Sequence, residues 1–141
     1  MRTVLAATTG FVLLTAIALA APAVKVEPLC PVSGHACDPA ATAAFEGGKV
    51  CFCCDKCVKA FEADSAKFAA KARQQLVVTG QFVQKGCPLS GGPVKPGTQI
   101  DVGGVPVGFC CPNCKGKVAK ATPDEQVGMV FGSGKGFALA Q

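Results

Sequence analysis

The sequence has no tryptophan, no tyrosine and only one histidine. It therefore lacks the Trp and Tyr side chains on which nucleic-acid bases stack. Its 14 basic and 9 acidic residues give a net charge of +5, which forms no dense basic stripe of the kind that binds nucleic acid. The one histidine, His35, leaves the rest of the chain without the base of a Ser-His-Asp set. We therefore expect neither a nucleic-acid partner nor hydrolase chemistry.

The sequence also lacks an apolar run of the length that a membrane-spanning helix needs, about 20 residues. Its main apolar run, residues 11–21, follows Arg2, contains several small alanines and is closed by Pro22. This pattern is typical of a secretory signal peptide, and we predict that residues 1–23 form one that is removed. The mature protein is then expected to be secreted or periplasmic, with no stable membrane insertion.

Ten cysteines are the main signal in the composition. An exported chain of this size buries only a modest hydrophobic core, so cross-links are expected to stabilise it. Disulfides and bound metal ions both supply such cross-links, and both use cysteine.

Most of these cysteines belong to an internal repeat. Each copy reads C-P-[VL]-S-G, then a middle section, then F-C-C-x-x-C, with the same spacing and no gap. The second copy follows the first at an offset of 57 residues. The shared cysteines are Cys30, Cys53, Cys54 and Cys57 in the first copy and Cys87, Cys110, Cys111 and Cys114 in the second. Chance does not place four cysteines at one offset, so we expect the two sets to do the same job.

Two further cysteines, Cys37 and Cys51, occur only in the first copy, because Val94 and Gly108 stand at the matching positions. Since the two are present together or absent together, we interpret them as partners and favour a disulfide between them. The alternative is that they add ligands to the first copy's site. His35 also has no counterpart in the second copy, so we expect it to be a solvated loop residue outside the shared site.

The pattern predicts a small α+β fold, with two tandem β-hairpin-plus-helix modules of treble-clef or knuckle type after the signal peptide. In the second copy, residues 98–102 alternate, Gly103-Gly104 can turn, and residues 105–109 form another extended run. The first copy predicts the same hairpin less clearly, with a turn at Gly47-Gly48. Helices are expected at 57–63, 66–76 and 114–120, and from the capping box at Thr122–Glu125 onward.

These elements divide the mature chain into two repeats. We place the first at residues 28–76 and the second at 85–132. The linker between them is 77–84, and an extended run is expected at 76–79, where the linker begins. The glycine-rich residues 133–141 are expected to form a flexible tail.

The F-C-C-x-x-C segments lie where a strand turns into a helix, so their thiols can converge near exposed backbone N–H groups. Such N–H groups and a bound cation both lower the pKa of a thiol, and the thiolate is the metal ligand. With the remote first cysteine, each copy offers up to four sulfurs. Cysteine-only sites suit Zn²⁺ or Cu⁺ and disfavour Mg²⁺ and Ca²⁺. We therefore predict one Zn²⁺ or Cu⁺ ion per repeat, with the eight shared cysteines as candidate ligands.

Three of the four shared cysteines follow the spacing C-x22-C-x3-C in both copies. They are Cys30, Cys53 and Cys57, and Cys87, Cys110 and Cys114. With G-G-K-V-C-F-C-C before a lysine-rich helix, this spacing resembles the YHS and TRASH domains, small metal-binding modules associated with handling and sensing of copper and other heavy metals. The resemblance implies that these six cysteines are metal ligands, with Cys54 and Cys111 extra to the family's core. It favours a metal carrier, buffer or sensor over an enzyme.

Two other classes of protein stay open on the sequence. A disulfide-stabilised scaffold or interaction protein without metal fits an even number of cysteines in an oxidising compartment. Adjacent pairs such as Cys53-Cys54 weigh against it, because neighbouring cysteines rarely bond to each other. A thiol-disulfide oxidoreductase could use Cys54-x-x-Cys57 or Cys111-x-x-Cys114. Each unit of about 50 residues is, however, too short for the βαβ framework that this motif accompanies.

Overall fold

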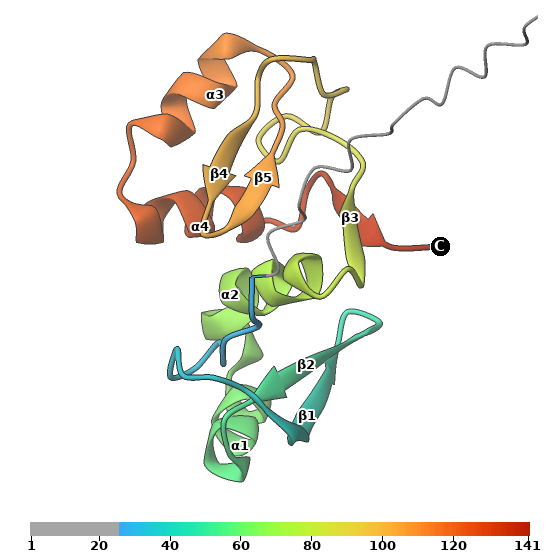
Figure 1. Ribbon diagram of the computed structural model, residues 1–141, viewed down its shortest axis with the longest axis vertical. Helices are drawn as coiled ribbons and strands as arrows, with labels where there is room; N and C mark the ends of the chain where they lie inside the picture. The colour runs from blue at the N-terminus through green and yellow to red at the C-terminus, as the bar shows by residue number, and fades with distance from the viewer. Residues whose placement is uncertain (1–25) are drawn as a thin grey trace, which may run out of the picture.

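Two hairpin-plus-helix units follow one another along the chain in a mixed α+β fold (Figure 1). The computed structural model describes residues 26–141, so the predicted signal peptide at 1–23 lies outside the described residues. Residues 26–141 contain four helices and three separate antiparallel strand pairs, and none of these pairs closes into a larger sheet. No helix in this range has the length and apolar character needed to cross a membrane.

The first unit contains one hairpin and two helices, which are β1 (Asp38–Phe45), β2 (Gly48–Phe52), α1 (Asp55–Ala63) and α2 (Ser65–Val78). The hairpin turns at Glu46 and Gly47, whose φ angles of 49° and 84° are both in the left-handed region. This is one residue earlier than the Gly47-Gly48 turn we expected. Asp64 caps α2, accepting a 3.2 Å hydrogen bond from the backbone N–H of Lys67.

The second unit repeats this order with shorter strands, as β4 (Ile100–Val102), β5 (Val105–Val107), α3 (Pro112–Ala119) and α4 (Pro123–Phe131). Gly103 and Gly104 form the expected turn, with φ angles of 58° and 83° that favour glycine at both positions. The capping box is also present, since the backbone N–H of Thr122 donates to the Glu125 carboxylate at 2.9 Å.

Two segments that we expected to be extended or loose have a different structure. Residues 76–78 continue helix α2, because the Leu76 side chain is fully buried. The helix ends at Val78, and Gly80, with a φ of 73°, follows in the turn after it. The predicted linker also contains β3 (Phe82–Gln84), which pairs with β6 (Phe137–Leu139) inside the predicted flexible tail. Phe137 is buried with its ring 5.1 Å from that of Phe131, and this packing orders the tail at that point.

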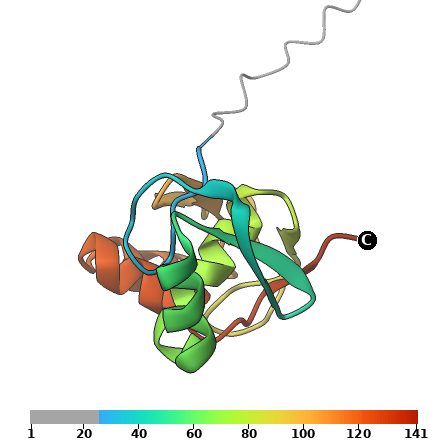
Figure 2. The same ribbon diagram turned by 90° about the horizontal axis from the view of Figure 1, so that it is seen from below.

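The two units share one hydrophobic core that includes the fully buried Phe52, Phe109 and Phe131. Helix α2 lies at the centre of Figure 1 and packs against α4 of the second unit. Seen from below, the hairpin β1–β2 and helix α1 lie in front of the second unit (Figure 2). Arg73 of α2 joins the units, since its guanidinium pairs with Glu46 and donates to the Phe131 carbonyl at 3.0 Å.

Candidate metal centres

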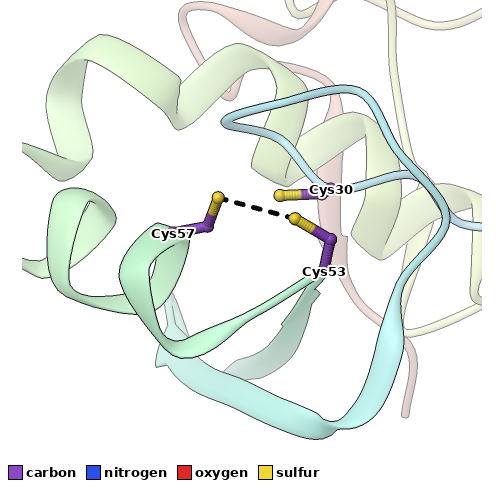
Figure 3. A group of neighbouring side chains, drawn as sticks. All are labelled: Cys30, Cys53 and Cys57. Atoms are coloured by element: carbon purple, nitrogen blue, oxygen red, sulfur yellow. Dashed lines mark hydrogen bonds between the residues drawn. The ribbon is translucent and has the colours of Figure 1, made fainter.

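The first cysteine triad gathers three sulfurs from three places in the first unit (Figure 3). Cys30 lies in the loop before β1, Cys53 directly follows β2, and Cys57 lies in the first turn of α1. Their Sγ atoms all lie within 4.8 Å of one another, and Cys53 Sγ is 3.6 Å from Cys57 Sγ. Helix α1 begins two residues earlier than we expected, so Cys57 is its third residue and not its first.

The second triad has the same construction. Cys87, Cys110 and Cys114 also have their Sγ atoms within 4.8 Å of one another, and the Cys110 to Cys114 sulfur distance is 3.7 Å. The first cysteine of each triad is buried, and the other two are partly exposed. The structure therefore brings together, in both units, the six cysteines implied by the family resemblance.

The loop C-P-[VL]-S-G positions the first cysteine of each triad. In the first unit the Gly34 N–H donates to the Cys30 carbonyl at 2.8 Å, and the Cys30 N–H donates to the His35 carbonyl at 2.8 Å. The second unit has the same tight turn, in which the Gly91 N–H donates to the Cys87 carbonyl at 2.7 Å. Gly34 and Gly91 have φ angles of 76° and 77°, which explains why both copies of the motif have glycine there.

A serine in each loop contacts the second cysteine of the triad. The Ser33 hydroxyl oxygen is 3.1 Å from Cys53 Sγ, and the Ser90 hydroxyl oxygen is 3.2 Å from Cys110 Sγ. Sequence reasoning did not assign these serines to the site, although their place in the repeated motif was the signal for them.

Cys54 and Cys111 lie beside the triads rather than in them. Cys54 is exposed, and its Sγ is 3.8 Å from both Cys53 Sγ and Cys57 Sγ. Cys111 Sγ is likewise 3.8 Å from Cys110 Sγ. A fourth sulfur therefore lies beside each triad, exposed at Cys54 and partly buried at Cys111.

The protein environment separates the thiols of each triad by their pKa. Burial opposes ionisation of Cys30, but the hydroxyl and N–H of Ser33 and the backbone of Cys53 and Val32 outweigh it, so its pKa is lowered to about 6. Partial burial and the neighbouring thiols of Cys53, Cys54 and Cys30 raise the pKa of Cys57 to about 12. One thiol of the triad therefore ionises near neutral pH, and another keeps its proton there.

The second triad shows the same separation. Burial again opposes ionisation of Cys87, and hydrogen bonds from the Ser90 hydroxyl and from nearby backbone lower its pKa to about 6. Burial and the adjacent thiols raise the pKa of Cys114 to about 12. The two sites are therefore matched in charge as well as in geometry.

Cys37 and Cys51 are free thiols in the structure, as are the other eight cysteines. The Cys37 thiol donates to the Cys51 carbonyl at 3.3 Å, and burial together with the nearby Cys51 thiol raises its pKa to about 12. The two side chains are thus neighbours outside the triad, and the disulfide between them stays a prediction. His35 is exposed, as expected for a solvated loop residue.

The donor set of each triad fits a soft metal ion. Sulfurs bound at about 2.3 Å in a tetrahedral zinc site lie about 3.8 Å apart. The sulfur distances within the C-C-x-x-C segments are 3.6 to 3.8 Å. With the first cysteine's sulfur within 4.8 Å of the other two, each triad is positioned to hold one metal ion through thiolates.

Sequence reasoning missed two glutamines, Gln75 in the first unit and Gln84 at the second. Each makes hydrogen bonds to the two backbone segments that carry one triad. They do not match under the repeat offset, so no sequence signal pointed to them.

The fold and the two triads are those of a small cysteine-rich protein positioned to bind metal. No protein-family model matches the chain, and neither a curated protein nor a solved structure matches it.

Proposed function

We propose that each triad binds one soft metal ion, Zn²⁺ or Cu⁺, and that the protein is an exported metal carrier or buffer. The observation that carries this proposal is the duplication of the triad. Two separate loops, strands and helices bring three sulfurs to within 4.8 Å in the same order. A disulfide scaffold without metal gives no reason for three free thiols to converge twice in this way.

The choice of metal follows from the sulfur count. Three thiolates alone suit Cu⁺, whereas four in a tetrahedron suit Zn²⁺. Cys54 and Cys111 would supply the fourth sulfur from the solvent side, at the 3.8 Å separation described above. We therefore assign the triads as the binding core, with Cys54 and Cys111 as the outer ligands that a four-coordinate ion would recruit.

A carrier or buffer is favoured over a purely structural metal site by the way the fold is stabilised. The domain has a hydrophobic core of its own, with Phe52 and Phe109 fully buried directly before the cysteine pairs. Structural zinc sites commonly take the place of such a core, and the apo forms unfold. Here the exposed Cys54 also leaves the first site open to an exchanging ligand.

Export and family membership are separate parts of the proposal. Export rests on the leader pattern of residues 1–23. A YHS- or TRASH-type, treble-clef-like module rests on the repeated cysteine spacing and on the order of hairpin and helix in each unit.

Native mass spectrometry of the mature protein, purified with and without reductant, tests the proposal because it counts metal ions and disulfides together. We expect two metal ions per chain and one disulfide, between Cys37 and Cys51, in the oxidised sample. A protein with five disulfides and no metal would instead be a disulfide scaffold. Metal uptake that fails even after reduction and addition of Zn²⁺ or Cu⁺ would exclude the metal-binding function.

A further inference from the structure

A buried glutamine side chain joins the two backbone segments that carry the first triad. The Gln75 side chain is only 3% exposed. Its amide nitrogen donates to the Leu29 carbonyl and to the Cys51 carbonyl, both at 2.8 Å. Its amide oxygen accepts from the Cys51 N–H at 2.8 Å. Leu29 directly precedes Cys30, and Cys51 stands two residues before Cys53.

The second unit contains the same three hydrogen bonds to backbone, made by Gln84. The Gln75 amide nitrogen makes one further contact, to Cys37 Sγ at 3.3 Å, and Val94 stands at the matching position of the second unit. The Gln84 amide nitrogen donates to the Gly86 carbonyl at 2.9 Å and to the Gly108 carbonyl at 2.7 Å. Its amide oxygen accepts from the Gly108 N–H at 2.9 Å. Gly86 and Gly108 are the repeat counterparts of Leu29 and Cys51, so all three bonds go to equivalent backbone atoms.

The two glutamines themselves are not equivalent in the repeat. Gln75 lies on helix α2, after the cysteines of the first unit, whereas Gln84 lies on strand β3, before those of the second. The repeat counterpart of Gln75 is Gly132, which has no side chain to make these bonds. The same three hydrogen bonds are therefore made by side chains of two different elements, α2 and β3. Duplication of the sequence alone does not explain this, because it would place the glutamines at equivalent positions.

We propose that Gln75 and Gln84 are positioning residues that set the separation of the triad sulfurs before metal binds. This inference rests on the proposed function. One planar amide fixes the distance between the backbone at the first cysteine and the backbone at the C-C-x-x-C segment. The sulfurs branch from those two segments one or two residues later, so their separation follows from the amide. Outer groups that hold metal ligands in place typically change metal affinity by about 10–100-fold when removed.

The variants Gln75→Met and Gln84→Met test the proposal, because methionine keeps the length of the side chain and removes the amide. Cadmium ions serve as the probe in the full-length mature protein, since cadmium NMR gives a separate resonance for each site and responds to the number of bound thiolates. We expect Gln75→Met to weaken cadmium binding at the first site by about 10–100-fold and to shift only that resonance. Gln84→Met should do the same at the second site alone.

Gln74→Met is the matched control. Gln74 is the neighbour of Gln75 on α2, and its amide donates to the Gly103 carbonyl at 2.9 Å, away from both triads. It should lower thermal stability without moving either cadmium resonance. If Gln75→Met lowers thermal stability but leaves both cadmium affinities and both resonances unchanged, Gln75 is only structural and the inference is wrong.

Two further outcomes keep the inference separate from the proposed function. If the wild type takes up no cadmium, the metal-binding function fails and the inference fails with it. If the wild type takes up two ions and both Met variants bind them equally well, only the inference fails. Should Gln75→Met not fold, Gln84→Met decides the question, because Gln84 is only partly buried.

Discussion

The two units keep the same triad but differ in what surrounds it. The first unit has thiols at Cys37 and Cys51, where the second has Val94 and Gly108. Its hairpin strands have 8 and 5 residues, whereas those of the second unit have 3 each. The sulfur distances, the serine contacts and the left-handed glycines nevertheless agree between the units. The difference teaches that the sites constrain the local geometry of the sulfurs, while hairpin length and neighbouring side chains are free to vary.

The glutamine bonds extend this lesson to the sequence itself. Gln75 and Gln84 satisfy equivalent backbone atoms from unrelated positions in the chain. What the two units share is a set of hydrogen bonds rather than an aligned residue.

Removal of one triad should have the largest effect. Replacing Cys110 and Cys114 with serine should abolish one of two metal equivalents, because a serine hydroxyl does not replace a thiolate for a soft ion. Native mass spectrometry of the variant should show one bound ion, held by the first site. The matched change of Cys53 and Cys57 should leave one ion at the second site. Serine at Cys37 and Cys51 should leave both ions bound. Full metal content in the Cys110/Cys114 or the Cys53/Cys57 variant would contradict the ligand assignment.

Acid should weaken both sites in the same way. Cys57 and Cys114, with pKa values of about 12, must release protons to bind metal at any pH near neutral. At Cys30 and Cys87, whose pKa values are about 6, protons begin to compete with the metal for the thiolate only below about that pH. Affinity should therefore fall as pH falls, and by about a further tenfold per pH unit below about pH 6. Cadmium titrations across this range should show the same break at both sites, whereas a pH-independent affinity would contradict the thiolate assignment.

A substitution at Gly108 tests why the second unit has glycine where the first has Cys51. A Cβ atom there would lie 2.4 Å from Val94 Cγ1, which is a steric clash. Gly108→Ala should lower the free energy of unfolding by about 1 kcal/mol, the low end for overpacking, because the loop of Val94 is exposed and can adjust. Urea unfolding measures this, and adding Val94→Ala should restore most of the loss. A loss that persists in the double variant would show that the clash is not its cause.

The contacts of Arg73 should contribute least to stability where they are most exposed. Glu46 pairs with Arg73 near the surface, so Glu46→Gln should cost only about 0.2–1 kcal/mol in urea unfolding. Arg73→Met should cost more, because it also removes the donor to the Phe131 and Gly132 carbonyls. Equal costs for the two variants would mean that the carbonyl bonds contribute nothing.

The repeat made the triads and hairpins predictable, because spacing and turn residues are local signals. Gly103-Gly104 and the capping box at Thr122 are in the structure as expected. The repeat alone grouped the eight shared cysteines as one class of candidate ligands. The family resemblance set Cys54 and Cys111 apart, and the geometry likewise leaves these two outside the triads. The repeat alone cannot show which of two adjacent thiols points toward the first cysteine of its unit.

The parts that failed depend on contacts between distant segments. Residues 76–79 read as an extended run, yet burial of Leu76 against the shared core keeps them helical through Val78. Nothing local in the glycine-rich tail predicts β6, which forms only because β3 offers a free edge and Phe137 packs on Phe131. Gln75 and Gln84 were invisible for the same reason, since their partners lie 46 and 24 residues away at Leu29 and Gly108.

Three consecutive residues of helix α2 contact three different parts of the molecule. Arg73 reaches the end of α4, Gln74 reaches the turn at Gly103, and Gln75 reaches the backbone beside the first triad. Successive side chains of a helix point about 100° apart, so these three contacts together fix the rotation of α2 about its own axis. Insertion of a single residue before Arg73 would misdirect all three side chains at once, so α2 should tolerate substitutions on its exposed face far better than any change in its length.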